Sequence, residues 1–326
     1  MMFLAMTMRE INLVATLVVG ACLPAAGAEL RLGIIGTDTS HATAFTQLLN
    51  DPASADRVAG ARVVAAYKGG SPDIAQSATR VEGYARDLQT KWGVEIVPDI
   101  PSLCGKVDAI LLLSVDGRVH LEQAKLAFAA HKPMFIDKPL AATLEDAREI
   151  DRLAAAAGVA WFTSSSLRFS DVVAALKSPD AQAVFTWGPG PLEEHHHLDL
   201  SWYAIHPIEM LYALLGTGCE EVTRLYTADG DVITGKWSGG RTGTVRTLRP
   251  YGGYGGVVFR PNQVFVQSPP LKSVGYRELV AEIVKFFSTG KPPVPHEETL
   301  EIFAFMDAAL RSMQDGGKPV KLPAIR

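Results

Sequence analysis

Residues 30–41 read LRLGIIGTDTSH, an apolar run that leads into a turn of small and polar residues. The apolar and β-branched residues of Leu30–Ile35 predict a short buried strand that ends at Gly36. Residues 42–50 follow with apolar side chains at helical spacing. A strand, a tight turn and a helix in this order are typical of a dinucleotide-binding unit, and they decide the fold class.

The same alternation of strand and helix continues up to residue 165. Short, continuously apolar runs predict strands, and segments with helical spacing separate them. Strands are predicted at 61–67, 94–97, 107–114, 133–136 and 159–164, and helices at 74–92, 120–130 and 144–157. Strands that are apolar along their whole length are buried on both faces. Residues 29–165 are therefore predicted to form an α/β domain, a Rossmann-type doubly wound parallel sheet.

The pattern changes after Phe169, where the strands become longer and alternate in polarity. Such strands are predicted at 222–227, 232–237, 242–248 and 257–266, with a hairpin turn at 238–240 and helices at 276–287 and 297–314. Alternating polarity is typical of an antiparallel sheet with one solvated face. Residues 166–326 are therefore predicted to form an α+β domain on an open antiparallel sheet.

The composition excludes several classes of protein. The chain has 326 residues, of which 48% are hydrophobic and 20% charged, with a formal net charge of -4. It is too apolar and too evenly charged to be disordered, and it offers no strongly basic surface for nucleic acid. Three cysteines are too few for a disulfide scaffold. Two of them, Cys104 and Cys219, are predicted to be separate buried thiols.

The N-terminal segment has the features of a secretory signal. Arg9 precedes an apolar run over residues 11–23, and residues 26–28 read Ala-Gly-Ala, which fits signal peptidase. Residues 1–28 are therefore predicted to be a signal peptide, and the protein to be exported, periplasmic or extracellular. A lipobox-like sequence leaves a lipoprotein anchored through Cys22 open, as well as an uncleaved anchor; no other contact with a membrane is expected. No twin arginine is present, so export of a folded, cofactor-loaded protein is not supported.

The turn after the first strand matches the dinucleotide fingerprint G-x-G-x-x-G only in part. Gly36 occupies the first glycine position, but Asp38 and His41 occupy the second and the third. The carboxylate of Asp38 beside a pyrophosphate would cost roughly 3–4 kcal/mol at an effective dielectric constant of about 20. Two interpretations stay open: a loop that still holds a dinucleotide, and a structural turn in which Asp38 caps the helix.

The end of the second predicted strand lacks the carboxylate that usually binds the ribose of NAD. Residues 65–71 read AAYKGGS, without Asp or Glu. Lys68 and Ser71 would suit the 2′-phosphate of NADP instead. The alternative is a solvated Lys68 that binds no adenosine.

Five segments, in the order of the chain, carry a resemblance to a known family. They are GIIG at 33–36, VDAI at 107–110 with the loop 114–120, KPMFIDKPLA at 132–141, HPIE at 206–209, and a closing helix and strand at 308–320. From Leu30 to the C-terminus the chain resembles the Gfo/Idh/MocA family of oxidoreductases. Asp137 stands where the family's E-K-P segment has its glutamate.

The resemblance implies an NAD(P)-dependent oxidoreductase that acts on a sugar, a cyclitol or a related polyol. It assigns contact with nicotinamide and substrate to Lys138, and acid/base work or substrate binding to His206. The cofactor contacts that we predict are Gly36, Thr37, Asp38, Thr39, Ser40, His41, Lys68, Ser114, His120, Asp137 and Lys138. The substrate contacts that we predict are Arg168, His197, Trp202, Tyr203 and Glu209. The resemblance also suggests a homo-oligomer formed through the exposed face of the second sheet.

The position of Lys138 supports this role independently. It follows a predicted buried strand at its carboxyl end, where open α/β sheets bind their ligands. A lysine partly desolvated in a cleft has a lowered pKa and can donate to a hydroxyl or carbonyl oxygen. The alternatives are a solvated lysine at a strand end and, for His206 on an apolar helix, a core histidine with satisfied hydrogen bonds.

Two residues near His206 depart from the family's pattern. Trp202 stands where the family has an aspartate, and Ala204 where it has a glycine. A tryptophan cannot relay a proton, although it can stack on the C–H face of a sugar. Glu209 can still accept a hydrogen bond, while Arg168 binds either substrate oxygens or a carboxylate of the protein. These departures open a second hypothesis, an exported protein that binds or processes carbohydrate without redox turnover.

A third hypothesis concerns residues 193–199, which read EEHHHLD. Consecutive histidines on an extended loop point to alternate sides, so His195 and His197 could share a metal ion with Asp199 or His206. Such a site would suit a metal-assisted lyase or hydrolase. The alternative is a polar loop that lines a substrate cleft.

Overall fold

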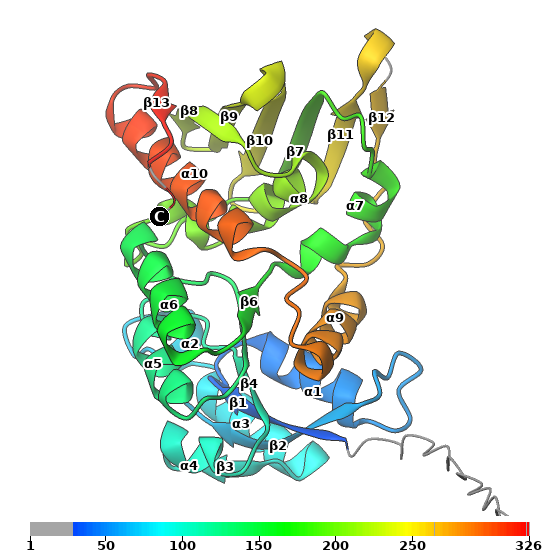
Figure 1. Cartoon of the computed structure of the whole chain (residues 1–326), viewed down its shortest axis with the longest axis vertical. Coiled ribbons are helices and arrows are strands. Elements are labelled where there is room, and N and C mark those ends of the chain that lie inside the picture. The colour runs from blue at the N-terminus through cyan, green and yellow to red at the C-terminus, as the bar shows by residue number, and fades with distance from the viewer. Residues whose placement is uncertain (1–28, 264, 324, 326) are drawn as a thin grey trace, which may run out of the picture.

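The computed structural model describes residues 29–263, 265–323 and 325. The predicted signal peptide, its cleavage site and Cys22 lie outside these residues. The described chain forms two sheets, and Figure 1 shows the N-terminal sheet in the lower half and the second sheet in the upper half.

The first sheet has six strands in the order β3-β2-β1-β4-β5-β6, and all neighbouring strands are parallel. The strands are β1 (Leu30–Ile35), β2 (Ala61–Tyr67), β3 (Glu95–Val97), β4 (Ala109–Leu112), β5 (Met134–Ile136) and β6 (Trp161–Thr163). The chain order reverses between β1 and β4, which is where such sheets bind their ligands. The predicted Rossmann-type sheet is confirmed.

Helices cover both faces of the first sheet (Figure 1). They are α1 (Ser40–Asn50), α2 (Ala75–Ala78), α3 (Val81–Trp92), α4 (Ile100–Cys104), α5 (His120–Ala129) and α6 (Leu144–Ala157). The side chains of Thr39, Asp99 and Thr143 accept hydrogen bonds from first-turn amides of α1, α4 and α6. These N-caps explain why the three helices begin where they do.

The single helix predicted at 74–92 is wrong, because this stretch forms α2 and α3 with a break at Thr79 and Arg80. Ser77 turns its hydroxyl onto Asp38, with 2.6 Å between the oxygens. This contact fixes α2 against the turn after β1 as a separate element.

The second sheet has seven strands in the order β12-β11-β7-β10-β9-β8-β13. They are β7 (Ala183–Pro189), β8 (Cys219–Thr227), β9 (Gly230–Trp237), β10 (Thr242–Leu248), β11 (Gly255–Phe259), β12 (Phe265–Gln267) and β13 (Val320–Lys321). The hairpin between β9 and β10 was predicted. The single strand predicted at 257–266 is instead the antiparallel pair β11 and β12.

This sheet is mixed rather than antiparallel throughout, because β7, which was not predicted, pairs with β10 in parallel. The helix α8 (Ile205–Leu215) connects β7 to β8, and a helical crossover returns the chain in its original direction. The strand β9 runs antiparallel to both β8 and β10, so β10 runs in the same direction as β8 and β7. The α+β character of this half is nevertheless confirmed.

One face of the second sheet is covered by α8 and α10 (His296–Gln314). Trp237 of β9 lies between the two helices, with ring centroids 5.5 Å from Tyr212 and 6.0 Å from Phe305. Residues of β9 and β10 alternate between buried and more exposed positions. The short helix α7 (Asp171–Leu176) lies near β11 at the other end of the sheet (Figure 1).

The helix α9 (Tyr276–Thr289) comes late in the sequence but packs on the first sheet beside α1 (Figure 1). Leu279 and Ile283 of α9 are buried in the same apolar cluster as Leu32 of β1 and Phe162 of β6. The chain therefore enters the second sheet after β6, returns to cover the first sheet, and then re-enters the second layer as α10.

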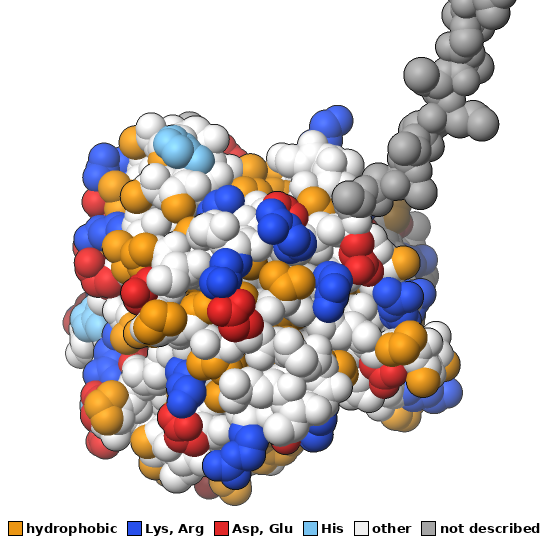
Figure 2. Space-filling model, turned by 90° about the horizontal axis from the view of Figure 1, so that it is seen from below, with side chains coloured by type: hydrophobic (Ala, Val, Ile, Leu, Met, Phe, Trp, Pro, Cys, Tyr) orange, Lys and Arg blue, Asp and Glu red, His pale blue; other side chains and the backbone are white. Residues whose placement is uncertain are grey.

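Positive and negative side chains are interspersed on the face of the first domain seen in Figure 2. Within residues 29–263, 265–323 and 325, no helix is both long enough and apolar enough to cross a membrane. Cys104 and Cys219 are both free and buried, as predicted.

Candidate active site

A pocket of about 170 Å³ lies beyond the carboxyl ends of β1 and β5, facing the second half of the chain. Ser40, His41, Lys138 and Tyr276 line it from the first layer, and Tyr203 and His206 from the second. Other hollows are larger, but this one gathers a lysine, two histidines and several tyrosine hydroxyls. Convergent polar groups in a concave site are the usual sign of a binding or active site.

Lys138 follows β5 directly and is half-buried in this pocket. Its Nζ lies 5.7 Å from the centre of the Tyr203 ring. Burial lowers the pKa of Lys138, and the nearby carboxylate of Asp137 opposes that effect only in part. The side chain is thus an ammonium group whose proton is easier to remove than that of a surface lysine.

His206 lies in the first turn of α8 and is buried. Its Nδ1 is 2.6 Å from Oγ of Ser165, which follows β6. Burial, together with the positive charge of Lys138, lowers the pKa of His206 well below its ordinary value. The imidazole is therefore neutral near pH 7, and the structure brings Lys138 and His206 together in one pocket, as the sequence predicts.

A hydrogen-bonded chain runs from β5 into the pocket. Asp137 Oδ2 lies 2.5 Å from Nδ1 of His41, and Nε2 of His41 lies 3.0 Å from the hydroxyl of Tyr276. Burial acts to raise the pKa of Asp137, but His41 and Lys138 outweigh it and hold that pKa below its usual value. Burial and nearby Asp137 raise the pKa of Tyr276 to about 12. The sequence did not single out Tyr276, whose helix lies far from the rest of the site in the chain.

The turn at Gly36 is built as predicted, but Asp38 is not the helix cap. Gly36 has φ +93°, and a Cβ there would stand 2.3 Å from the amide nitrogen of Ser114. Thr39 caps α1, while Asp38 is fully buried and accepts hydrogen bonds from Ser77 and from the amide of Val115. Burial raises the pKa of Asp38. The carboxylate therefore points toward α2 and the loop after β4.

Seven predicted cofactor contacts do not line the pocket: Gly36, Thr37, Asp38, Lys68, Ser114, His120 and Asp137. Lys68 forms an exposed ion pair with Glu82 at 2.9 Å. Ser114 donates to Gln123 at 2.8 Å, next to the turn. His120 is fully buried, with its ring nitrogens 2.7 Å and 3.1 Å from the carbonyl oxygens of Ser114 and Leu140. This histidine joins the loop after β4 to the segment after Lys138.

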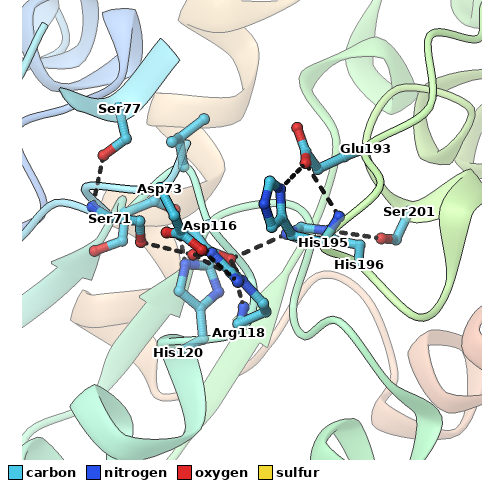
Figure 3. A network of polar contacts seen from close by, with 12 residues as sticks. Ser71, Asp73, Ser77, Asp116, Arg118, His120, Glu193, His195, His196 and Ser201 are labelled. Atoms are coloured by element: carbon cyan, nitrogen blue, oxygen red, sulfur yellow. Dashed lines mark hydrogen bonds and ion pairs between the residues drawn. The ribbon is translucent and has the colours of Figure 1, made fainter. Parts of the chain in front are cut away.

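Asp116 is the centre of a buried network that the sequence analysis missed (Figure 3). Ser71 donates to its Oδ2 at 2.6 Å, Arg118 donates to both oxygens, and His196 Nε2 lies 3.0 Å from Oδ1. Burial acts to raise the pKa of Asp116, but these hydrogen bonds outweigh it and hold that pKa well below its usual value. The loop after β4 is thereby tied both to the segment after β2 and to the second half of the chain.

Arg168 and Glu209 bind each other rather than lining the pocket, which corrects the prediction that both contact substrate. Arg168 Nε lies 2.7 Å from Glu209, and its other nitrogen lies 2.6 Å from Glu298. All three side chains are largely buried, so the guanidinium neutralises two carboxylates between the layers. The salt bridge that the sequence left open as an alternative is therefore the one observed.

Trp202 and His197 also lie outside the pocket, although Tyr203 lines it. Trp202 is buried against Ile74 and Val115, and His197 is exposed. The tryptophan therefore supports the loop after β2 instead of offering a face to a sugar.

The metal site of the third hypothesis is not formed by His195, His197 and Asp199. His195 pairs with Glu193, and Asp199 binds Arg224 through both oxygens at 2.8 Å. In the part of the chain that the structure describes, no three His, Cys, Asp or Glu side chains converge as metal ligands do. His196, the histidine that the sequence analysis passed over, is the one turned inward, onto Asp116.

Comparison with known proteins agrees with the fold. Residues 30–165 match the sequence model of the oxidoreductase family with an NAD-binding Rossmann fold, Gfo/Idh/MocA. A curated relative, the inositol 2-dehydrogenase of Paracoccus denitrificans, is 35% identical over 132 residues, which is 40% of this chain and 34% of that protein. The matched stretch thus spans about a third of the relative's length.

Solved structures resemble nearly the whole described chain. The myo-inositol dehydrogenase of Lactobacillus casei, in complex with NAD(H) and myo-inositol, has a TM-score of 0.71 and 19% identity over 91% of this chain and 97% of its own. A probable dehydrogenase of Thermotoga maritima has a TM-score of 0.72 and 21% identity over 90% and 99%. Residues 30–165 therefore resemble the NAD-binding domain of the Gfo/Idh/MocA oxidoreductases, and the two layers together share the fold of these solved structures.

Proposed function

We propose that this protein is a nicotinamide-dependent oxidoreductase that acts on a hydroxyl group of a polyol or cyclitol. One observation supports this most: Lys138 and His206, which come from opposite layers, line the same small pocket. The pocket's tyrosines offer hydroxyl groups and ring faces, which suit a ring or chain that carries many hydroxyls. The curated relative and the Lactobacillus casei structure are inositol dehydrogenases, which agrees with this substrate class.

The N-terminus of α1 could receive the pyrophosphate of a nicotinamide dinucleotide. Thr39 and Ser40 stand at the N-terminus of the 11-residue helix α1 and line the pocket, and such helix ends bind pyrophosphate through backbone amides. Lys138 would hold the nicotinamide end beside the substrate. When bound, the cofactor would accept or return the hydride.

The chain's own residues supply the proton transfer. When Nδ1 of His206 carries the ring proton, it donates to Ser165 and leaves Nε2 free to accept the proton of a substrate hydroxyl. The ammonium of Lys138 stabilises the negative charge that then develops on the substrate oxygen. In the opposite direction the same two groups return the proton.

Tyr276 provides a third polar contact for the substrate. When His41 donates through Nδ1 to Asp137, its Nε2 accepts the Tyr276 hydroxyl proton, so the phenolic oxygen is directed as an acceptor. An acceptor at this point would orient a second hydroxyl of the substrate and would favour a polyol over a simple alcohol.

The test is a substrate screen with the purified full-length protein. NAD+ and NADP+ are each offered with myo-inositol, scyllo-inositol, open-chain hexitols and simple alcohols, and NAD(P)H formation is followed by absorbance. The proposal expects turnover with at least one cyclitol or hexitol and none with ethanol. Absence of turnover with every polyol, or equal turnover with ethanol, would contradict it.

We also propose that the protein is exported, on the strength of the apolar run at 11–23 and the Ala-Gly-Ala at 26–28. The mass of the mature protein from its native cells distinguishes the routes. Cleavage after Ala28 removes 28 residues, whereas a lipoprotein would begin with an acylated Cys22. A full-length intracellular product would refute export.

A further inference from the structure

The connection between β2 and α3 lies over the place where a Rossmann-type sheet binds the pyrophosphate and the adenosine. Such ligands lie outside the carboxyl ends of the strands, with the pyrophosphate at the helix after the first strand and the ribose toward the second. The connection here has 13 residues, 68–80, whereas strand-to-helix connections usually have about 2–6. We call residues 69–80 the cover segment.

The cover segment binds the turn after β1 directly. Ser77 donates to the fully buried carboxylate of Asp38 at 2.6 Å. Thr37 donates to the carbonyl oxygen of Val81 at 3.0 Å, just after the segment ends. At its start, a Cβ on Gly69 would stand 3.4 Å from the Cα of Gly36. Side chains of the turn that would face a pyrophosphate are therefore engaged with the cover segment and the residue after it.

The cover segment is also held at the loop after β4. Ser71 donates to Asp116 at 2.6 Å, and the amide of Ser71 donates to Ser77, as Figure 3 shows. His196 reaches the same carboxylate from the second half of the chain, at 3.0 Å. Asp38 and Asp116 are both 0% exposed, so a ligand could reach neither while the segment stays in place.

The pocket that remains is too small for a dinucleotide. Its volume is about 170 Å³, and the cover segment contributes Gln76 and Arg80 to its wall. Pockets that hold drug-sized ligands usually measure about 300–1,000 Å³, and a dinucleotide is larger than such a ligand. A polyol could occupy this space with the segment in place, but a complete dinucleotide could not.

We propose that a nicotinamide dinucleotide binds this protein only by displacing the cover segment from the turn at Gly36. This inference rests on the proposed function, since it assumes that the protein uses such a cofactor. The closed form described here then excludes the cofactor, and the apparent dissociation constant exceeds the intrinsic one by the reciprocal of the open fraction. The serine–carboxylate contacts set that fraction.

The experiment uses the purified full-length protein and NADH as the probe. Hydrogen exchange is measured by mass spectrometry with and without NADH, and the NADH dissociation constant by fluorescence. The double variant Ser71→Ala/Ser77→Ala removes both serine–carboxylate contacts. Thr79→Ala is the matched control, because Thr79 lies in the same segment but donates only to the carbonyl oxygen of Ala75.

We expect NADH to increase exchange in residues 69–80 of the natural protein while protecting the start of α1. The double variant should bind NADH about tenfold more tightly, and Thr79→Ala should bind it as the natural protein does. Binding by the double variant alone would also support the proposal. The exchange measurement does not depend on the double variant folding.

Two results would overturn the inference, and they differ in what they say about the proposed function. If NADH binds while exchange in residues 69–80 stays the same or falls, the segment does not exclude the cofactor, and the proposed function stands. If neither the natural protein nor the folded double variant binds NADH or NADPH at millimolar concentration, both the inference and the nicotinamide-dependent function are wrong.

Discussion

The Nζ atom of Lys138 lies 5.7 Å from the centre of the Tyr203 ring, so a cation from one layer rests over an aromatic face from the other. A cation–π contact of this kind contributes roughly 0.5–2 kcal/mol, depending on desolvation. It retains the ammonium in the pocket although burial lowers the pKa of Lys138. The site is therefore complete only when both halves of the chain are folded together.

Replacing Lys138 tests the site directly. Lys138→Ala should lower kcat for polyol oxidation by about 10²–10⁴-fold, because it removes the group that stabilises the developing alkoxide. The control is Lys125→Ala, a surface lysine paired with Glu122 within α5. The measurement is steady-state NADH formation, and unchanged kcat in the folded Lys138 variant would exclude the assigned role.

The pH dependence of kcat/KM should reflect two lowered pKa values. Because His206 must be neutral to accept a proton and its pKa is lowered, activity should be lost on acidification only well below pH 6.5. Because Lys138 must be charged and its pKa is lowered, activity should fall on the alkaline side below pH 10.5. Lys138→Arg should move the alkaline limb upward if it retains turnover. An acid limb at or above pH 6.5 would contradict the role of His206.

Tyr276→Phe removes the hydroxyl at the end of the Asp137–His41 chain. We expect kcat for a cyclitol to fall about tenfold, with a smaller effect on a simple diol, since only the polyol uses the second contact. NADH binding should change little. Tyr226→Phe, on the exposed side of β8, is the control. An equal loss for both alcohols would show that Tyr276 merely holds α9 in place.

Arg168→Met should be costly for stability and mild for catalysis. It leaves Glu209 and Glu298 buried without their cation, and breaking a buried pair in this way costs roughly 3–5 kcal/mol in the free energy of unfolding. Arg152→Met breaks an exposed pair with Glu149 and should cost at most about 1 kcal/mol. Urea unfolding compares the two. Near-normal kcat in the folded Arg168 variant would confirm that this arginine does not bind substrate.

The parts of the molecule that local pattern determines could be predicted from the sequence. The strands β4 and β5 are continuously apolar, and Lys138 follows β5 at its carboxyl end, where sites form. His206 was placed by its surroundings in an apolar helix and by the family resemblance. For these residues the neighbouring sequence contains the information.

Contacts between distant segments were not predictable in the same way. The bond from His196 to Asp116 joins residues 80 positions apart, and the choice of His196 over its two histidine neighbours depends on which side of the loop faces inward. The parallel pairing of β7 with β10 likewise depends on a crossover, not on the composition of either strand. Polar residues show no periodicity that would reveal such partners.

The return of α9 to the first sheet means that the chain cannot be divided at the point where its sequence likeness to the family ends. A fragment that stops at residue 165 would lack the Leu279 and Ile283 side chains that pack in the same apolar cluster as Leu32 and Phe162. It would therefore expose a hydrophobic surface to solvent. Such a fragment should aggregate when it is produced alone. Co-expression with residues 166–326 as a separate polypeptide should restore the solubility of the fragment, because α9 would again pack on the first sheet.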